Sequence, residues 1–145
     1  MLSNITSPSE LQSKWKQRGL RVSLSWLQQC WVHFSNSNST NGRKNLNFEQ
    51  FAFLCCLHSD LHQIGEVNLP PGIQNWHDKS LDGPFVLQIN EMWNIADAYE
   101  TRDKDSLKRS LKINITDGFQ QIAGFEYKKI NTLPINAPPG TKVQF

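Results

Sequence analysis

Apolar side chains recur at helical spacing in three stretches of the first 65 residues. In SPSELQSKWKQRGL, Ser7 is a suitable N-cap, Pro8 follows at the first helical position, and Gly19 ends the pattern. Leu11 and Trp15 lie one helical turn apart on the same face. Apolar residues also recur every three or four positions in VSLSWLQQCWVHF and in LNFEQFAFLCCLHSDL. The pattern predicts a small bundle of three short helices with a core of Trp and Phe.

From residue 85 onward the apolar residues alternate with polar ones, which is typical of β-strands. Three strands are predicted in PFVLQINEMWNI, SLKINIT and FQQIAGFEYKKI, and a fourth begins in PPGTKVQF. Leu111, Ile113 and Ile115 should point inward from the second strand. Residues 66–84 contain Gly, Pro and Asp with little periodicity, and they predict a linker or a long surface loop wrapped on the domain.

Turn residues connect these strands in a meander. Asp117 and Gly118 are a strong hairpin signal, and Gly124 inside the third strand predicts a bulge or a sharp bend. Pro139 and Gly140 form a turn before the last strand. Such a curved meander suits an OB (oligonucleotide/oligosaccharide-binding) barrel, which needs five strands.

The predicted fold class is therefore α+β, with a three-helix bundle followed by an incomplete antiparallel OB-fold barrel. We expect a helical module at 1–65, a linker at 66–84 and an OB fold at 85–145, truncated before its closing strands.

Composition narrows the function classes only modestly. The formal net charge is +2 and the pI is about 8.5, which is less basic than a dedicated nucleic-acid domain usually is. Cys30, Cys55 and Cys56 are an odd number of cysteines in apolar surroundings, and they predict reduced thiols in an intracellular protein. No run reaches the ~18 apolar residues of a membrane span, and we expect no signal peptide.

The sequence gives little support for a catalytic site or a metal-binding site. His58 and His62 lie one helical turn apart beside two cysteines, as zinc ligands can, but no second ligand pair follows at metal spacing. We therefore expect ordinary packing and surface histidines and no metal. A nucleophile elbow, paired carboxylates and a phosphate-binding loop are all absent from the sequence, so neither an enzyme nor a cofactor is expected.

Aromatic residues near the end of the meander allow two interpretations. Phe119, Phe125 and Tyr127, followed by Lys128 and Lys129, are candidates for stacking single-stranded nucleic acid. The alternative, that Phe125 and Tyr127 fill the barrel or its contact with the helices, is the one we favour. The charged segment from Asp97 to Arg109 also has two interpretations, a solvated connection or a loop that inserts into a partner.

Six short motifs add a family resemblance. In order along the chain they are WLQQC, LHSDL, LPPGI, LQIN, ITDGFQQIAGFEY and PPGTK. Their order and spacing resemble the N-terminal region of the RecQ-mediated genome instability protein 1 family. More distantly, the chain is similar to the Tudor-domain partner of topoisomerase III beta.

The resemblance implies a non-catalytic scaffold and regulatory subunit. Its partners would be a type IA topoisomerase, topoisomerase III, and a Bloom-type RecQ helicase. The complex would act in the nucleus, in DNA repair, replication and homologous recombination, where it would dissolve double Holliday junctions and limit crossovers. Weak DNA contact is also expected, and the alternative function is that of a single-stranded nucleic-acid-binding OB module.

The resemblance also implies the site residues. The family's OB fold carries an insertion that reaches the topoisomerase gate, and the matching segment here, 97–109, is short. The expected topoisomerase-binding residues are Lys142, Asp97, Tyr99, Glu100, Arg102 and Asp103. The expected structural motif residues are Asp117, Gly118, Gly124, Pro139 and Gly140.

Overall fold

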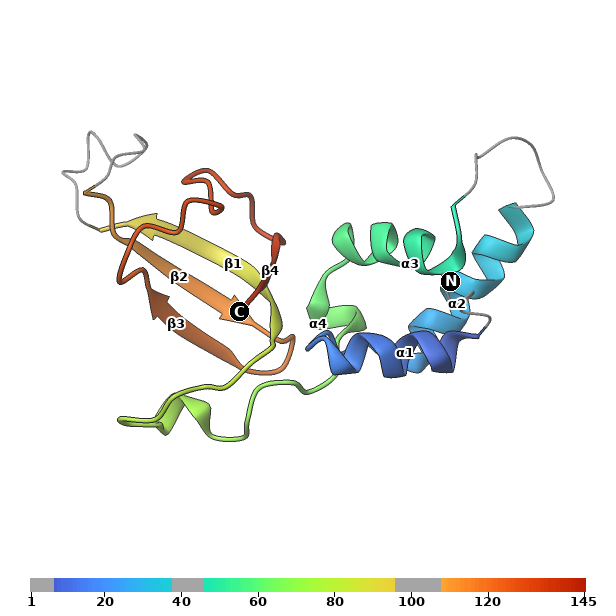
Figure 1. Ribbon diagram of the computed structural model, residues 1–145, viewed down its shortest axis with the longest axis horizontal. Coiled ribbons are helices and arrows are strands. Elements are labelled where there is room, and N and C mark those ends of the chain that lie inside the picture. Colours follow the sequence, from blue (N-terminus) through green and yellow to red (C-terminus); the bar gives the residue numbers. More distant parts are fainter. Residues whose placement is uncertain (1–6, 38–45, 96–107) are drawn as a thin grey trace.

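A computed structural model describes residues 7–37, 46–95 and 108–145, with helices gathered at one end and a sheet at the other (Figure 1). The first helix begins as the sequence predicts, since the Ser7 Oγ accepts a hydrogen bond from the Glu10 N–H at 3.3 Å. It ends at Gln17, and Gly19 follows the C-cap residue Arg18 with a φ of +83°, which glycine adopts at little cost. The helices are α1 (Pro8–Gln17), α2 (Leu24–Ser37), α3 (Phe48–Leu57) and the short α4 (Leu61–Ile64).

The third predicted helix, in the stretch 46–61, is wrong in its length, because α3 stops at Leu57 and a separate short helix, α4, begins at Leu61. After Leu57, the Ser59 hydroxyl donates to the Cys55 carbonyl at 2.7 Å. Asp60 starts α4 by accepting from the His62 N–H at 2.9 Å. A serine and an aspartate that bond the backbone locally compete with a continuous helix, which explains the break.

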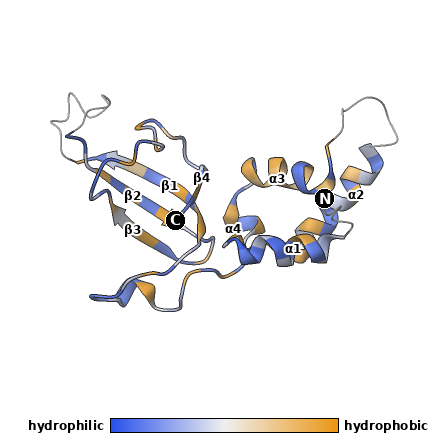
Figure 2. Ribbon diagram, in the orientation of Figure 1, coloured by the Kyte–Doolittle hydropathy of each residue, from blue (hydrophilic) through white to orange (hydrophobic). Residues whose placement is uncertain are grey.

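The helices enclose an apolar core that includes Leu11, Trp15, Leu27, Phe48 and Cys56. The outer side of α3 is apolar as well, since Phe53, Leu54 and Leu57 are all exposed, and Figure 2 colours much of this helix as hydrophobic. In the part of the chain that the structure describes, no helix is both long and apolar enough to cross a membrane.

The sheet is antiparallel throughout, as expected. Its strands are β1 (Val86–Asn94), β2 (Leu111–Thr116), β3 (Gln121–Phe125) and β4 (Lys142–Gln144), in the spatial order β3-β2-β1-β4. The predicted inward residues Leu111, Ile113 and Ile115 are buried, which confirms the alternation read from β2. The helices followed by this sheet confirm the predicted α+β class.

The sequence predicts a bulge or a sharp bend at Gly124, and the bulge is wrong. Gly124 pairs with Ile113 in an unbroken register between β2 and β3. The register shifts instead in β1, between Ile89 and Glu91. At this point β1 also bonds its other neighbour, because the Gly140 N–H donates to the Ile89 carbonyl at 2.8 Å. At this place β1 bonds β2 on one side and the turn before β4 on the other, and the extra residue, Asn90, lies there.

The favoured interpretation of the aromatic residues is also wrong. Phe125 is 62% exposed and Tyr127 is 94% exposed, so neither fills the barrel. The interior is filled by aliphatic side chains instead, and these are Leu69, Ile73, Leu87, Ile89, Leu111, Ile113, Ile115 and Leu133.

Residues 66–84 pack against the sheet half. Leu69 and Ile73 are buried in the sheet core, and Ile73–Asn75 form a 3₁₀ turn, η1. The Gln74 side chain donates to the Gln121 carbonyl at 2.8 Å. This segment therefore covers one end of the sheet although it has little regular structure of its own.

Candidate partner-binding site

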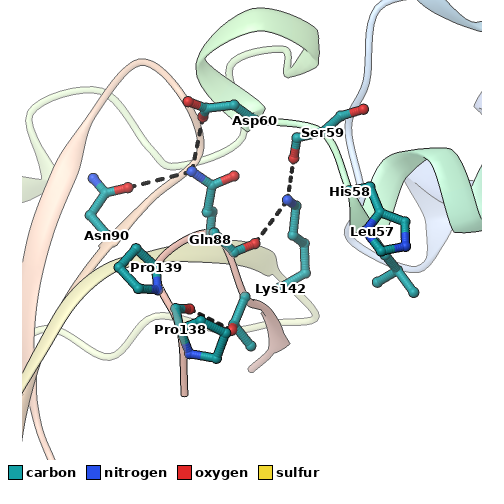
Figure 3. A pocket seen from close by; sticks show the side chains of 11 residues that line it. Leu57, His58, Ser59, Asp60, Gln88, Asn90, Pro138, Pro139 and Lys142 are labelled. Carbon is teal, nitrogen blue, oxygen red and sulfur yellow. Dashed lines mark hydrogen bonds between the residues drawn. The ribbon is translucent and has the colours of Figure 1, made fainter. Parts of the chain in front are cut away.

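A cavity of about 650 Å³ lies where the helices meet the sheet (Figure 3). We call it the junction pocket. Its wall comes from the α3–α4 link, from β1 and from the turn before β4. The lining residues are Leu57, His58, Ser59, Asp60, Gln88, Asn90, Pro138, Pro139, Gly140, Thr141 and Lys142.

The turn before β4 has the geometry that its sequence predicts. The Thr141 N–H donates to the Pro138 carbonyl at 3.2 Å, and Gly140 has a φ of +93°. Proline at the second position and a positive-φ glycine at the third are the features of a type II turn. The turn places Pro139 and Gly140 on the rim of the pocket, and β4 starts immediately after it.

Lys142 is half-buried and points into the joint between the two halves (Figure 3). Its ammonium donates to the Ser59 carbonyl and, at 2.9 Å, to the Gly140 carbonyl. Burial lowers the pKa of Lys142, although Cys56 and Asp60 act in the opposite direction. The charge therefore holds the α3–α4 link against the turn.

Asp60 supplies the negative charge of the pocket. Hydrogen bonds from the His62 N–H, the Gln88 amide and the His62 ring lower the pKa of Asp60 to about 2. The His62 Nδ1 lies 2.7 Å from the Asp60 Oδ1. About half of the Asp60 side chain is exposed, so an ionised carboxylate faces solvent at the pocket.

Gln88 connects the two halves from the inside. Its Nε2 donates to Asp60 Oδ1 at 2.9 Å, and its Oε1 accepts from the Leu61 N–H at 2.9 Å. Sequence reasoning missed both Asp60 and Gln88. The N-cap position of Asp60 before an apolar turn was a usable signal, whereas alternation placed Gln88 on the outer face.

Asp117 and Gly118 lie outside this pocket, at a second contact between the halves. The Asp117 carboxylate accepts four backbone N–H groups at 2.8 Å, from Asn68, Leu69, Phe119 and Gln120. Burial alone would raise the pKa of Asp117, but these four bonds outweigh it and the pKa is lowered. A Cβ on Gly118 would meet the Leu61 carbonyl oxygen at 2.2 Å, so the turn fits against α4 only with glycine.

Gly124 lies in β3 and does not line the pocket. Asp97, Tyr99, Glu100, Arg102 and Asp103 lie outside the described residues and stay predictions. Among residues 7–37, 46–95 and 108–145, the structure has no group of three or more His, Cys, Asp or Glu side chains that could hold a metal ion. The junction pocket offers a carboxylate, two side-chain amides and a turn, which suit hydrogen bonding to a polypeptide.

Comparison with known proteins agrees with this architecture. Residues 97–145 match the family model described as "RMI1, N-terminal OB-fold domain". RecQ-mediated genome instability protein 1 from Oryza sativa is 36% identical over 131 residues, covering 86% of this chain and 15% of the relative. The Arabidopsis thaliana protein of the same name is 39% identical over 99 residues, covering 66% of this chain and 15% of the relative.

A second group of relatives is also similar. Tudor domain-containing protein 3 from Danio rerio is 35% identical over 88 residues, covering 61% of this chain and 12% of the relative. The chain thus spans between 12% and 15% of the length of these three relatives. The matched OB-fold model, the relatives and the helix-then-sheet fold show that this chain belongs to the RecQ-mediated genome instability protein 1 family.

Proposed function

We propose that this chain is a non-catalytic scaffold subunit that binds a type IA topoisomerase, topoisomerase III, through the junction pocket. One observation carries the proposal. Three motifs far apart in the sequence, LHSDL, LQIN and PPGTK, all contribute residues to this one cavity. A site assembled from distant motifs at the contact of two substructures is a common arrangement for recognition.

The relatives support a wider role. They carry the name RecQ-mediated genome instability protein 1, which supports the proposal of a complex that also contains a Bloom-type RecQ helicase. We propose that such a complex acts in the nucleus, in DNA repair and homologous recombination, and dissolves double Holliday junctions without crossovers. In it the chain would stabilise one conformation of the topoisomerase by binding that conformation more tightly.

The test is binding of the full chain to the cognate topoisomerase III, measured by pull-down and by titration. Asn90→Arg should weaken binding about tenfold or more, since a long charged side chain would occupy the pocket. Asn114→Arg is the matched control, because Asn114 is likewise half-buried on the sheet, makes a similar 3.4 Å amide bond and lies outside the pocket. Equal affinity of the two variants would exclude the pocket, and no binding by the unchanged chain would refute the proposal.

Lys142→Glu examines the predicted site residue itself. We expect weaker topoisomerase binding, because the variant loses the bonds that hold Ser59 and the turn together. Lys16→Glu, an exposed charge reversal on α1, should leave the affinity unchanged. An affinity for Lys142→Glu equal to that of Lys16→Glu would remove Lys142 from the site.

A further inference from the structure

Two thiols meet where α2 packs against α3. Cys30 of α2 is buried in the helical core, and Cys55 of α3 packs against that core with its side chain half-buried. The two side chains share a hydrogen bond, and all three cysteines of the chain are free. Two sulfur atoms in such contact need only a short approach to reach the S–S separation of about 2 Å in a disulfide.

Of these two thiols, Cys55 is the one that small molecules can reach from solvent. It lines a cavity of about 280 Å³ together with Phe34 of α2, Phe51 of α3 and the exposed His58, whereas Cys30 does not line this cavity. A water molecule occupies about 30 Å³, so the cavity has room for several molecules of that size. A small oxidant such as hydrogen peroxide therefore has access to the Cys55 side chain.

The other two thiols are held in the protonated form. Burial, and after it the negative charge of a Cys55 thiolate, raise the pKa of Cys30 to about 12. Burial raises the pKa of Cys56 to about 11, although Lys142 acts in the opposite direction. Because the thiolate is the nucleophile in thiol oxidation, Cys55 is the thiol that attacks an oxidant first.

Cys56 is not a suitable second partner for Cys55. Neighbouring residues on a helix point about 100° apart, so a bond between these two sulfur atoms would require α3 to unwind. Cys56 is also 1% exposed, and its side chain interacts with Lys142. Cys30, which already shares a hydrogen bond with Cys55, is therefore the partner that the fold supplies.

We propose that Cys30 and Cys55 form a disulfide between α2 and α3 when hydrogen peroxide enters the cavity beside Cys55. The Cys55 thiolate attacks one peroxide oxygen, the O–O bond breaks, and the hydroxide that leaves takes up a proton to give water. The Cys30 sulfur then attacks the sulfenic acid at Cys55. The S–S bond forms, the S–O bond breaks, and the leaving hydroxide takes the Cys30 proton to give a second water. The two thiols lose two electrons, which the peroxide gains, and this modification does not depend on topoisomerase binding.

The test is treatment of the full chain with hydrogen peroxide, followed by alkylation of the remaining thiols and peptide mass spectrometry. We expect a crosslink between the peptides that contain Cys30 and Cys55, and dithiothreitol should remove it. Cys56→Ala is the matched control and should keep the crosslink, whereas Cys55→Ala should abolish it. Absence of the crosslink in the folded, unchanged chain, or its loss in Cys56→Ala, would overturn the proposal.

The order of the two steps has its own readout. In Cys30→Ala the sulfenic acid has no thiol to attack it, so it should accumulate at Cys55, where dimedone labels it. In Cys55→Ala, dimedone should label neither Cys30 nor Cys56. Labelling of Cys30 in that variant, or no labelling of Cys55 in Cys30→Ala, would contradict the proposed roles.

Thermal stability tests whether the disulfide fits the folded helices. Oxidation should raise the melting temperature of the unchanged chain by about 5 °C or more, because the bond closes a loop of about 25 residues in the unfolded chain. The same treatment should leave the melting temperature of Cys30→Ala unchanged. A fall in the melting temperature of the unchanged chain, or an equal rise in Cys30→Ala, would refute a disulfide that the native fold accommodates.

Discussion

The helical half and the sheet half are stabilised in different ways. The helical core combines aromatic rings with thiols, and Phe48 alone packs within 5.7 Å, centroid to centroid, of both Trp31 and Phe34. The fully buried residues of the sheet core are all aliphatic, and the rings of Trp76 and Phe85 pack against it only partly buried. Among the described residues, the buried polar or charged side chains all lie in the sheet half, and they are Gln88, Asn94, Arg109, Thr116, Asp117 and Glu126.

The difference follows from how each half satisfies the hydrogen bonds of its backbone N–H and carbonyl groups. A helix satisfies most of its own N–H and carbonyl groups, so its side chains are free to be apolar. The segments 66–84 and 126–141 have little regular structure and lie against the sheet, so their buried backbone groups need other partners. In the first segment, Asp117 accepts hydrogen bonds from backbone N–H groups. In the second, the Arg109 guanidinium donates to a backbone carbonyl and the Glu126 carboxylate accepts from a backbone N–H.

The largest expected effect comes from Arg109. Its guanidinium pairs with Glu126 at 3.0 Å and donates to the carbonyls of Ile130 and Leu133. Arg109→Met should lower the free energy of unfolding by about 3–5 kcal/mol, because it leaves a buried carboxylate without its counter-charge. Chemical denaturation measures the loss.

Two variants sharpen the result for Arg109. The double variant Arg109→Met/Glu126→Met should recover part of the loss, since it removes the unpaired charge. Lys14→Met breaks the partly exposed Lys14–Glu49 pair of the helical half and should cost no more than about 1 kcal/mol. Similar losses in Arg109→Met and Lys14→Met would abolish the distinction between the two halves.

Asp117→Asn should have the second largest effect. The amide can accept at only one oxygen, so its NH₂ faces one pair of backbone N–H groups that now lack an acceptor. We expect a loss of about 2 kcal/mol in the free energy of unfolding. Asp82→Asn, at an exposed aspartate of the same half, should be neutral, and a neutral Asp117→Asn would show that the four bonds contribute no net stability.

Acid should weaken the buried carboxylate contacts of the sheet half, and it should also weaken the hydrogen bonds that Asp60 makes where the halves meet. Glu126 resembles Asp117. Burial alone would raise the pKa of Glu126, but hydrogen bonds with the Ile130 N–H, the Arg109 guanidinium and the Leu111 backbone lower it. Their ordinary values are 3.8 for Asp117 and 4.5 for Glu126, and folding depresses both. The stability they contribute is therefore present above about pH 4.5 and is lost as the pH falls through the folded pKa values.

The measurement is the free energy of unfolding between about pH 6 and pH 2. The decline should be shallower in Asp117→Asn, which lacks one of the three carboxylates whose pKa is lowered in the folded chain, namely Asp60, Asp117 and Glu126. A decline equally steep in that variant would assign the acid sensitivity to other carboxylates.

The smallest effect should come from a conservative change in the helical core. Phe48→Leu keeps an apolar side chain of comparable size but loses edge contacts to the Trp31 ring, whose centroid lies 4.9 Å away. We expect a loss of about 1 kcal/mol and no change in the acid dependence. A change in the acid dependence would show that the two halves do not separate as described.

Local patterns in the sequence were sufficient where the controlling interactions are local. Ser7 and Pro8 start α1, Asp117 and Gly118 turn between β2 and β3, and Gly140 allows the turn before β4. Each of these depends on dihedral preference or on hydrogen bonds to residues within three positions along the chain. The alternation in β2 likewise predicted its buried face.

Only the tertiary structure decided the rest, because the controlling partners are distant in the sequence. Asp117 is more than a turn residue since Asn68 and Leu69, some fifty positions earlier, donate to it. Lys142 reaches Ser59 across 83 positions, and Gln88 reaches Asp60 across 28. The exposure of Phe125 was decided in the same way, because aliphatic residues from several segments already fill the interior. The period of a sequence indicates which residues share one side of a strand, but packing against the other segments decides which side becomes the core.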